Sequence, residues 1–253
     1  MSSSRKKSID VGVQILRNVC TVFLMPLLFV QAMVLRNKIP KLSIPNDVPF
    51  GNCGGEEPCF SLLVLGESPV AGYGLSSYSD VFAAHLAHCF SSKGHCVHWK
   101  SCGWVGININ ELRDKDWPVE HFDLVFVAMG VNDIKNLTTA SRWRVGIRLL
   151  ISRIKRQYPK AKIVFSGTPP VGAFPVLPFS LALVLGWRRD VLEQVLCEEL
   201  ERQDIVYVSM TQSFDERFFV SDRFHPSALA HKIWAQSVSD KLIYSMDSFF
   251  VDR

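Results

Sequence analysis

The chain has 253 residues, of which 48% are hydrophobic, and a formal net charge of +4 at pH 7. This length suits one α/β domain with an extension. The small net charge gives no reason to expect a nucleic-acid partner, and the hydrophobic content is high for a purely soluble protein. The sequence contains no internal repeat and no low-complexity tract.

The excess of hydrophobic residues lies near the start of the chain. Residues 18–35 contain no charged side chain and are just long enough to cross a bilayer. Because basic residues flank both ends of this stretch, the positive-inside bias does not decide its orientation. We expect residues 1–36 to form a hydrophobic helix that anchors the protein in a membrane or lies at its interface. Two alternatives are a helix folded onto the rest of the chain and a cleaved signal, although no small-residue cleavage site follows. The flanking basic residues are Arg5, Lys6, Lys7 and Arg17 before the stretch, and Arg36, Lys38 and Lys41 after it.

Residues 37–58 are rich in proline and glycine and show no periodicity, which predicts a linker. The main domain is then expected to cover residues 59–253. Cys53 and Cys59 flank an acidic stretch and could pair in an oxidising compartment. We expect the remaining cysteines of the domain to be buried thiols, namely Cys89, Cys96, Cys102 and Cys197. No Cys-x-x-Cys or His-Glu-x-x-His spacing occurs, so we expect no metal ion.

Apolar strand patterns and helical patterns alternate through the main domain. Such alternation favours a parallel sheet covered by helices on both faces, a three-layer α/β/α architecture. Strands are expected at about 60–65, 95–100, 122–129, 162–166 and 205–208. Helices are expected after residue 78 and at about 141–157, 180–203 and 227–244.

Three polar motifs follow or precede these elements. The strand at 62–65 leads directly into Ser68, and the strand at 123–129 leads into Asn132. Near the C-terminus, Asp222 and His225 stand three residues apart, just before the last helix. Because the carboxyl ends of parallel strands meet at one edge of a sheet, we expect these groups to lie close together. A serine, a histidine oriented by an aspartate and an asparagine are the groups that acyl transfer requires. For Asp133 we expect a capping role, through bonds to backbone N–H groups.

In these motifs the sequence resembles the SGNH hydrolases, the GDSL-like esterase and lipase family. Four blocks carry the resemblance in the family's order: Gly66-Glu67-Ser68 with Gly72, residues 103–108, residues 130–133 and residues 222–226. Together they extend over about residues 60–243. The resemblance implies a flavodoxin-like α/β/α fold and a serine hydrolase that needs no cofactor.

The resemblance also implies a role for each matching residue. It makes Ser68 the nucleophile and His225 the general acid and base, oriented by Asp222. The oxyanion hole would consist of the backbone N–H groups of Ser68 and Gly106 and the side-chain amide of Asn132. Gly103 is the rival of Gly106. Glu67 stands where the family usually has aspartate, and we expect little effect on the chemistry.

Residues 163–187 contain no charged side chain, and their prolines argue against a simple membrane span. This stretch follows a strand and could line an acyl pocket, in which Phe174 and Leu177 would contact the substrate. The helix at 141–157 is basic, but Trp143 is its only aromatic residue. It therefore lacks the stacking platforms typical of nucleic-acid binding.

We therefore expect a membrane-associated serine hydrolase that cleaves carboxylic esters, with acyl or lipid esters favoured. An acyltransferase or a carbohydrate deacetylase would use the same triad and remains an alternative. A non-catalytic, membrane-anchored binding protein on the same fold is the other alternative.

Overall fold

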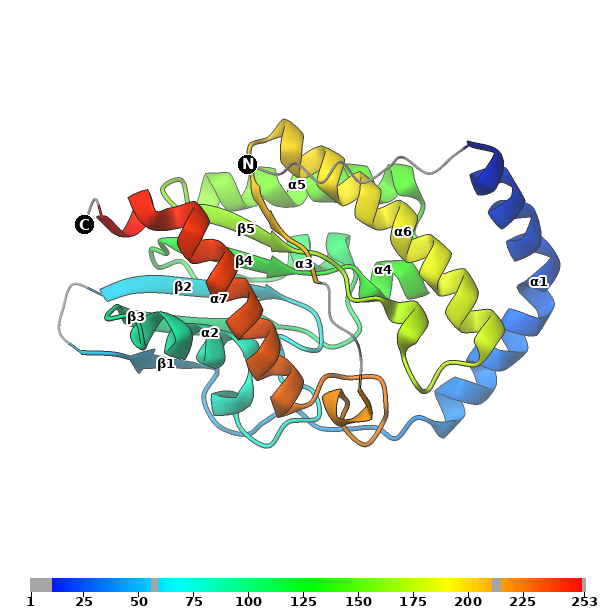
Figure 1. The fold of residues 1–253 in the computed structure, drawn as a ribbon, viewed down its shortest axis with the longest axis horizontal. Coiled ribbons are helices and arrows are strands. Elements are labelled where there is room, and N and C mark those ends of the chain that lie inside the picture. The colour runs from blue at the N-terminus through cyan, green and yellow to red at the C-terminus, as the bar shows by residue number, and fades with distance from the viewer. Residues whose placement is uncertain (1–10, 56–58, 211–214, 252–253) are drawn as a thin grey trace.

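The computed structural model describes residues 11–55, 59–210 and 215–251 (Figure 1). The basic residues Arg5, Lys6 and Lys7, which bear on the expected membrane orientation, lie outside these ranges.

A six-stranded sheet forms the centre of the described chain, with the strand order β1-β3-β2-β4-β5-β6. All neighbouring strands are parallel except β1, which pairs antiparallel with β3. The predicted parallel sheet is therefore confirmed, with one antiparallel edge strand that lies inside the predicted linker. The strands are β1 (Phe50–Cys53), β2 (Cys59–Gly66), β3 (Cys96–Gly103), β4 (Leu124–Ala128), β5 (Lys162–Ser166) and β6 (Val206–Val208).

Helices cover both faces of this sheet, as the alternating pattern predicted. Figure 1 shows α2 and α7 crossing one face, while α3, α5 and α6 lie on the other. The helices are α1 (Val11–Lys38), α2 (Phe82–Ser91), α3 (Ile109–Asp114), α4 (Val131–Lys135), α5 (Ala140–Gln157), α6 (Phe179–Arg202) and α7 (Ala228–Val251).

The alternation of side chains along the central strands divides the hydrophobic core into two layers. In β2, Leu62 and Val64 pack toward α2 and α7, whereas Leu63 and Leu65 pack toward α3, α5 and α6. All of these side chains are fully buried, and each stabilises the fold by about 1.5–3 kcal/mol. Because both faces are covered, the central strands are continuously apolar, and this is the pattern that the sequence showed.

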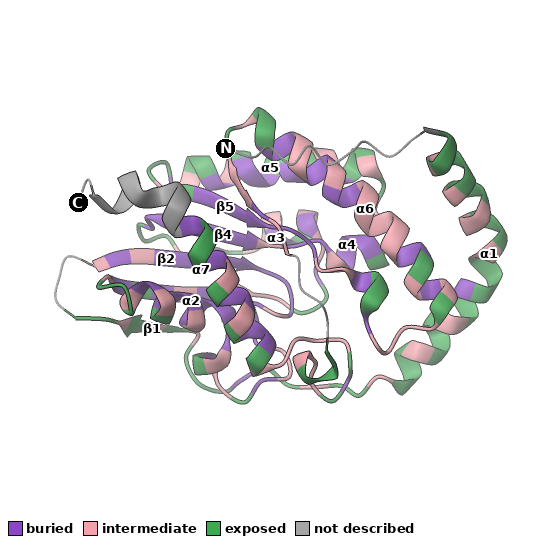
Figure 2. Cartoon of the chain, viewed as in Figure 1, coloured by how far each residue is buried: buried purple, intermediate pink, exposed green. Residues whose placement is uncertain are grey.

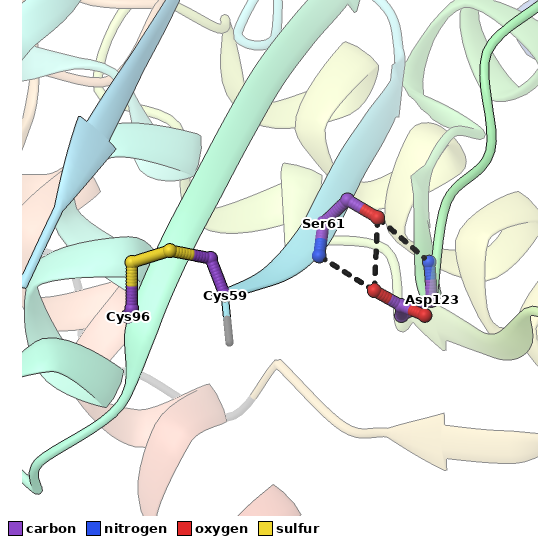
Figure 3. The surroundings of a disulfide bond; sticks show 4 residues. All are labelled: Cys59, Ser61, Cys96 and Asp123. Atoms are coloured by element: carbon purple, nitrogen blue, oxygen red, sulfur yellow. Dashed lines mark hydrogen bonds between the residues drawn. A yellow bond between two sulfur atoms is a disulfide. The ribbon is translucent and has the colours of Figure 1, made fainter. Parts of the chain in front are cut away.

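Strand pairing at the start of β2 is reinforced by a disulfide and a side-chain network (Figure 3). Cys59 is bonded to Cys96, so the pairing considered between Cys53 and Cys59 is wrong, as is the expectation that Cys96 is a free thiol. The reason is the register: Cys59 lies beside Cys96 on parallel strands, whereas Cys53 lies beside Val97. On the other side, the Asp123 carboxylate accepts hydrogen bonds from the N–H (2.8 Å) and hydroxyl (2.9 Å) of Ser61.

Helix α1 lies at the end of the molecule toward which β4 and β5 point (Figure 1). One side of it contacts α6: Arg17 lies 3.5 Å from Asp190, and the Ser180 hydroxyl donates to Gln31 Oε1 at 2.8 Å. Leu28 is its buried apolar anchor. Most other described residues of α1 are exposed and the remainder are half-buried, as Figure 2 shows by colour. The exposed apolar side chains include Val19, Val22, Phe23, Leu27, Phe29, Val30, Met33 and Val34.

The segment that follows α1, residues 39–49, lies along the domain and is called the belt below. The Leu42 N–H donates to Tyr73 Oη at 2.9 Å, and the Asp47 carboxylate accepts the Tyr78 N–H at 3.0 Å. This part of the predicted linker is therefore held by hydrogen bonds to loops of the main domain.

Candidate active site

Ser68 lies in a tight turn at the carboxyl end of β2. The turn closes through hydrogen bonds from the Ala71 N–H to the Glu67 carbonyl (3.1 Å) and from the Tyr73 N–H to the Ser68 carbonyl (3.0 Å). The side chain of Ser68 is 6% exposed and contributes to the wall of a cavity. The strand and turn thus present its hydroxyl at the sheet edge where the sequence predicted it.

Asp222 and His225 form a hydrogen-bonded pair before α7. Asp222 Oδ2 lies 2.5 Å from His225 Nδ1, and Asp222 Oδ1 accepts the backbone N–H groups of Phe224 (2.8 Å) and His225 (2.9 Å). Arg223 allows this tight loop by adopting a left-handed backbone, with φ of 57°. Burial raises the pKa of Asp222, but the bonds from His225 and Phe224 outweigh this, so its pKa lies below the usual range. Asp222 is therefore a carboxylate that can orient the imidazole.

Glu67 also contributes to the cavity wall, and its carboxylate receives three N–H groups from Gly130 and Asn132, which follow β4. It accepts the Gly130 N–H, the Asn132 N–H (3.0 Å) and the Asn132 side-chain amide (2.6 Å). Gly130 has a φ of 128°, a conformation that favours glycine, and an added Cβ would meet Thr168 at 2.3 Å. Burial raises the pKa of Glu67 to about 7, against the opposing effect of these hydrogen bonds.

The loop between β3 and α3 brings Gly106 to the cavity. Gly106 has a φ of 80°, and its Cβ position is open space. Gly103 does not line the cavity, because it packs so closely on the next turn that a Cβ would lie 2.1 Å from the Ala71 nitrogen. Of the two glycines weighed from the sequence, Gly106 is the one beside Ser68 in the cavity wall.

Two residues hold the Gly106 loop in place. Asn108 caps α3: its side chain accepts the Asn110 N–H (3.0 Å) and the Glu111 N–H (3.2 Å), while Glu111 accepts the Asn108 N–H (2.8 Å). Asp133 accepts the Ile109 N–H at 3.0 Å, which ties α3 to α4; it does bond a backbone N–H, as expected, but at the start of the earlier helix α3 and not in the helix or turn that follows it.

The cavity of about 200 Å³ brings together Ser68, Gly106, Asn132 and His225. No hydrogen bond joins Ser68 to His225 within the described ranges. Most of the wall is apolar and includes Val105, Met129, Val131, Phe174, Met210, Phe218, Phe219, Phe224 and Trp234. The predicted contact residue Phe174 packs edge-to-face against Phe219 and Phe224. Leu177, predicted to share this role, lies outside the lining and packs on the core.

Three residues that line the cavity have N–H groups for which no hydrogen bond is found among the described residues. Neither the Ser68 N–H nor the Gly106 N–H has a hydrogen-bond partner among the described residues. The amide of Asn132 has two hydrogens and donates one of them to Glu67. This is a cluster of donors on the wall that also carries the Ser68 hydroxyl.

Sequence reasoning did not find three residues of this site. Glu67 was expected to affect the geometry of the turn and to have little effect on the chemistry, yet its carboxylate accepts the Asn132 amide. The ring of Tyr73 lies against His225, with the ring centres 4.7 Å apart, and Lys135 lines the cavity mouth. Lys135 carried no sequence signal, because α4, the short helix that places it three residues after Asn132, was not predicted from the sequence.

The fold is a three-layer α/β/α domain in which a serine, an asparagine and a histidine line one cavity at the carboxyl edge of the sheet. The chain belongs to the GDSL-like lipase/acylhydrolase family, whose sequence model matches residues 64–233. No curated protein has a sequence that matches this chain.

Solved structures share the fold at low sequence identity. A lipase/acylhydrolase from Enterococcus faecalis is 17% identical, with a TM-score of 0.57 over 72% of this chain and 95% of that chain. A carbohydrate acetylesterase from Sinorhizobium meliloti is 16% identical, with a TM-score of 0.55 over 73% and 99%. An aryl esterase from M. smegmatis is 15% identical, with a TM-score of 0.55 over 73% and 98%. The family and these neighbours support a hydrolase that acts on esters in general.

Proposed function

We propose that the protein hydrolyses carboxylic esters through an acyl-enzyme on Ser68. The observation that carries the proposal is the common cavity of Ser68, Asn132 and His225, with His225 held by the Asp222 carboxylate at 2.5 Å. With Nδ1–H donated to Asp222, Nε2 of His225 is the nitrogen left to accept the Ser68 proton.

Acylation begins when Ser68 Oγ attacks the ester carbonyl carbon and His225 takes the hydroxyl proton. The carbonyl π electrons move onto oxygen, and the tetrahedral intermediate carries the negative charge there. When it collapses, the bond to the alcohol oxygen breaks, and the alcohol leaves with the proton from His225. The serine keeps the acyl group.

The oxyanion is proposed to accept hydrogen bonds from the N–H groups of Ser68 and Gly106 and from the free amide hydrogen of Asn132. Their lack of other partners among the described residues supports this role. Donors fixed before the reaction stabilise developing charge without reorganising, and one such donor contributes about 10²–10³ in kcat.

Deacylation repeats these steps with water. His225 takes a proton from water, the hydroxyl oxygen attacks the acyl carbon, and the carboxylic acid is released as Ser68 regains its proton. An added alcohol in place of water would yield a new ester, which is how an acyltransferase would be recognised.

The apolar wall favours substrates with a hydrocarbon acyl chain, since Phe174, Phe219 and Phe224 exclude water from one side of the cavity. Helix α1 supports a membrane-associated enzyme, because its exposed side chains are mostly apolar and it is long enough to cross a bilayer. Both features suit esters that partition into lipid.

The test compares the full-length wild type with Ser68→Ala in detergent, on p-nitrophenyl esters from acetyl to palmitoyl. We expect the variant to lose activity on every ester, and a fluorophosphonate probe to label the wild type alone. No hydrolysis by the wild type and no labelling would contradict the proposal and favour a binding protein.

A further inference from the structure

Lys135 has a position in the cavity that the hydrolytic steps do not use. It lines the cavity from the last turn of α4, three residues after Asn132, and the residue as a whole is exposed although the protein partly surrounds its ammonium group. Residues three apart on a helix lie on one face. The ammonium group is therefore on the same face of α4 as the amide proposed to bind the oxyanion.

This ammonium group has no hydrogen bond or ion pair among the described residues. Glu67 is the nearest acidic candidate, but its oxygens already accept the N–H groups of Gly130 and Asn132. Glu67 and Lys135 interact only at longer range. The positive charge of Lys135 is thus left open toward the cavity mouth.

Arg36, in the last turn of α1, is a second positive charge that acts on Lys135 at longer range, but it is not among the residues that line the cavity. The pKa of Lys135 is below its usual range, first because the surrounding protein desolvates the ammonium and also because Arg36 repels it, while Glu67 opposes the shift. Arg36 is itself exposed. The cavity therefore combines the cationic side chain of Lys135 with a largely apolar wall, a combination suited to a molecule with an apolar chain and an anionic head.

We propose that Lys135 selects esters whose alcohol portion carries an anionic group, such as a phosphate, with the apolar acyl chain in the Phe174 wall. This inference rests on the proposed function and names the substrate class of that site. The acyl chain contacts the buried apolar wall, because removing its hydrocarbon surface from water is favourable. The charged alcohol portion stays near solvent, where it contacts Lys135.

The test uses two substrates with the same lauroyl chain: lysophosphatidic acid, which is anionic, and monolauroylglycerol, which is neutral. The readout is the ratio of kcat/KM for the anionic over the neutral ester. We expect this ratio to exceed one in the full-length wild type and to fall about fivefold in Lys135→Met, mainly through KM, since an exposed charge pair contributes up to about 1 kcal/mol. Lys135→Arg should largely restore the ratio.

Lys160→Met is the matched control, because Lys160 is an exposed lysine just before β5, at the opposite edge of the sheet from the cavity. Its ratio should equal that of the wild type. An unchanged ratio in Lys135→Met would overturn the inference, as would an equal loss on both esters, which would mean that Lys135 serves only Glu67. Inorganic phosphate is then added to each reaction, to find whether the phosphate group is recognised as a free anion or only as part of the lipid. If it inhibits hydrolysis of the anionic ester but not of the neutral ester, the phosphate itself is recognised.

These outcomes differ from a failure of the proposed function. If the wild type cleaves p-nitrophenyl esters and is labelled at Ser68 but shows no preference for the anionic ester, only the inference about Lys135 is wrong. If it cleaves no ester and is not labelled, the hydrolase mechanism itself is wrong.

Discussion

The Glu67→Gln substitution tests whether a buried carboxyl next to the nucleophile positions the oxyanion donor. Glu67 is 3% exposed and accepts three N–H groups, including the Asn132 amide at 2.6 Å. Glutamine has the same shape, but its NH₂ group must face one of these donors. At a pH above about 7, where Glu67 is ionised, loss of one charged hydrogen bond costs about 2 kcal/mol. If all of that loss were expressed in the transition state, kcat would fall by about thirty-fold.

The same substitution should change how stability depends on pH. Burial raises the folded-state pKa of Glu67 from 4.5 to about 7, so the folded protein binds this proton more tightly than the unfolded chain does. The resulting stability is fully present below pH 4.5 and is lost as the pH rises through about 7. Since each pKa unit corresponds to about 1.4 kcal/mol, the loss amounts to about 3 kcal/mol. Glutamine does not titrate, so the stability of wild type relative to Glu67→Gln should fall by this amount across the window.

Urea unfolding of the full-length proteins in detergent, at several pH values across this window, measures the difference. Glu199→Gln is the control: Glu199 is also a buried carboxylate, but hydrogen bonds from Arg148 lower its pKa to about 2. Its difference from wild type should therefore stay flat over the same range. A flat difference for Glu67→Gln as well would refute the raised pKa, and an unchanged kcat would refute the positioning role.

Two further outcomes follow from the cavity and the disulfide. Phe174→Asp should lower the ratio of kcat/KM for the octanoyl over the acetyl p-nitrophenyl ester by about tenfold, which corresponds to the loss of about two methylene contacts. Leu177→Asp is the control, because Leu177 lies outside the cavity lining. An equal fall of the ratio in Leu177→Asp would show that Leu177 belongs to the binding surface. Cys96→Ser should lower the unfolding free energy by up to about 4 kcal/mol, given the 37-residue separation of the bonded cysteines. Thermal unfolding with and without reductant measures this loss. Cys89→Ser is the control, because it removes a cysteine that forms no disulfide. Equal unfolding midpoints for the wild type and Cys96→Ser would show that the disulfide does not stabilise the fold.

The elements that the sequence predicted best are those whose residues carry their own signal. Strands β2, β4 and β5 are apolar runs that end in glycine or a polar residue, and the structure places each within about two residues of the expected range. The strand β1 was missed because its four residues, Phe50–Cys53, lack a buried face and depend on pairing with β3. A strand of this kind exists only through contacts with a distant segment, which local patterns do not encode.

In the candidate site, too, residues with a local sequence signal were predicted, and residues whose role depends on distant contacts were not. Ser68, Asp222 and His225 could be proposed from motifs because each follows or precedes an element with clear periodicity. The role of Glu67 could not, since it depends on the loop after β4 folding back over β2. The partner of Cys59 was equally hidden, because disulfide connectivity depends on strand register.

The belt limits how far the enzyme can reach. The chain from the end of α1 at Lys38 to Leu42, where the belt is bonded to Tyr73, spans at most about 14 Å when fully extended. If α1 resides in a bilayer with Lys38 at its surface, Leu42 cannot lie farther than this from the surface, and the domain bonded to Leu42 stays next to the membrane. Encounters with substrate would then occur by lateral diffusion within one membrane, so the turnover rate would follow the surface density of the ester in that leaflet and not its concentration in bulk water.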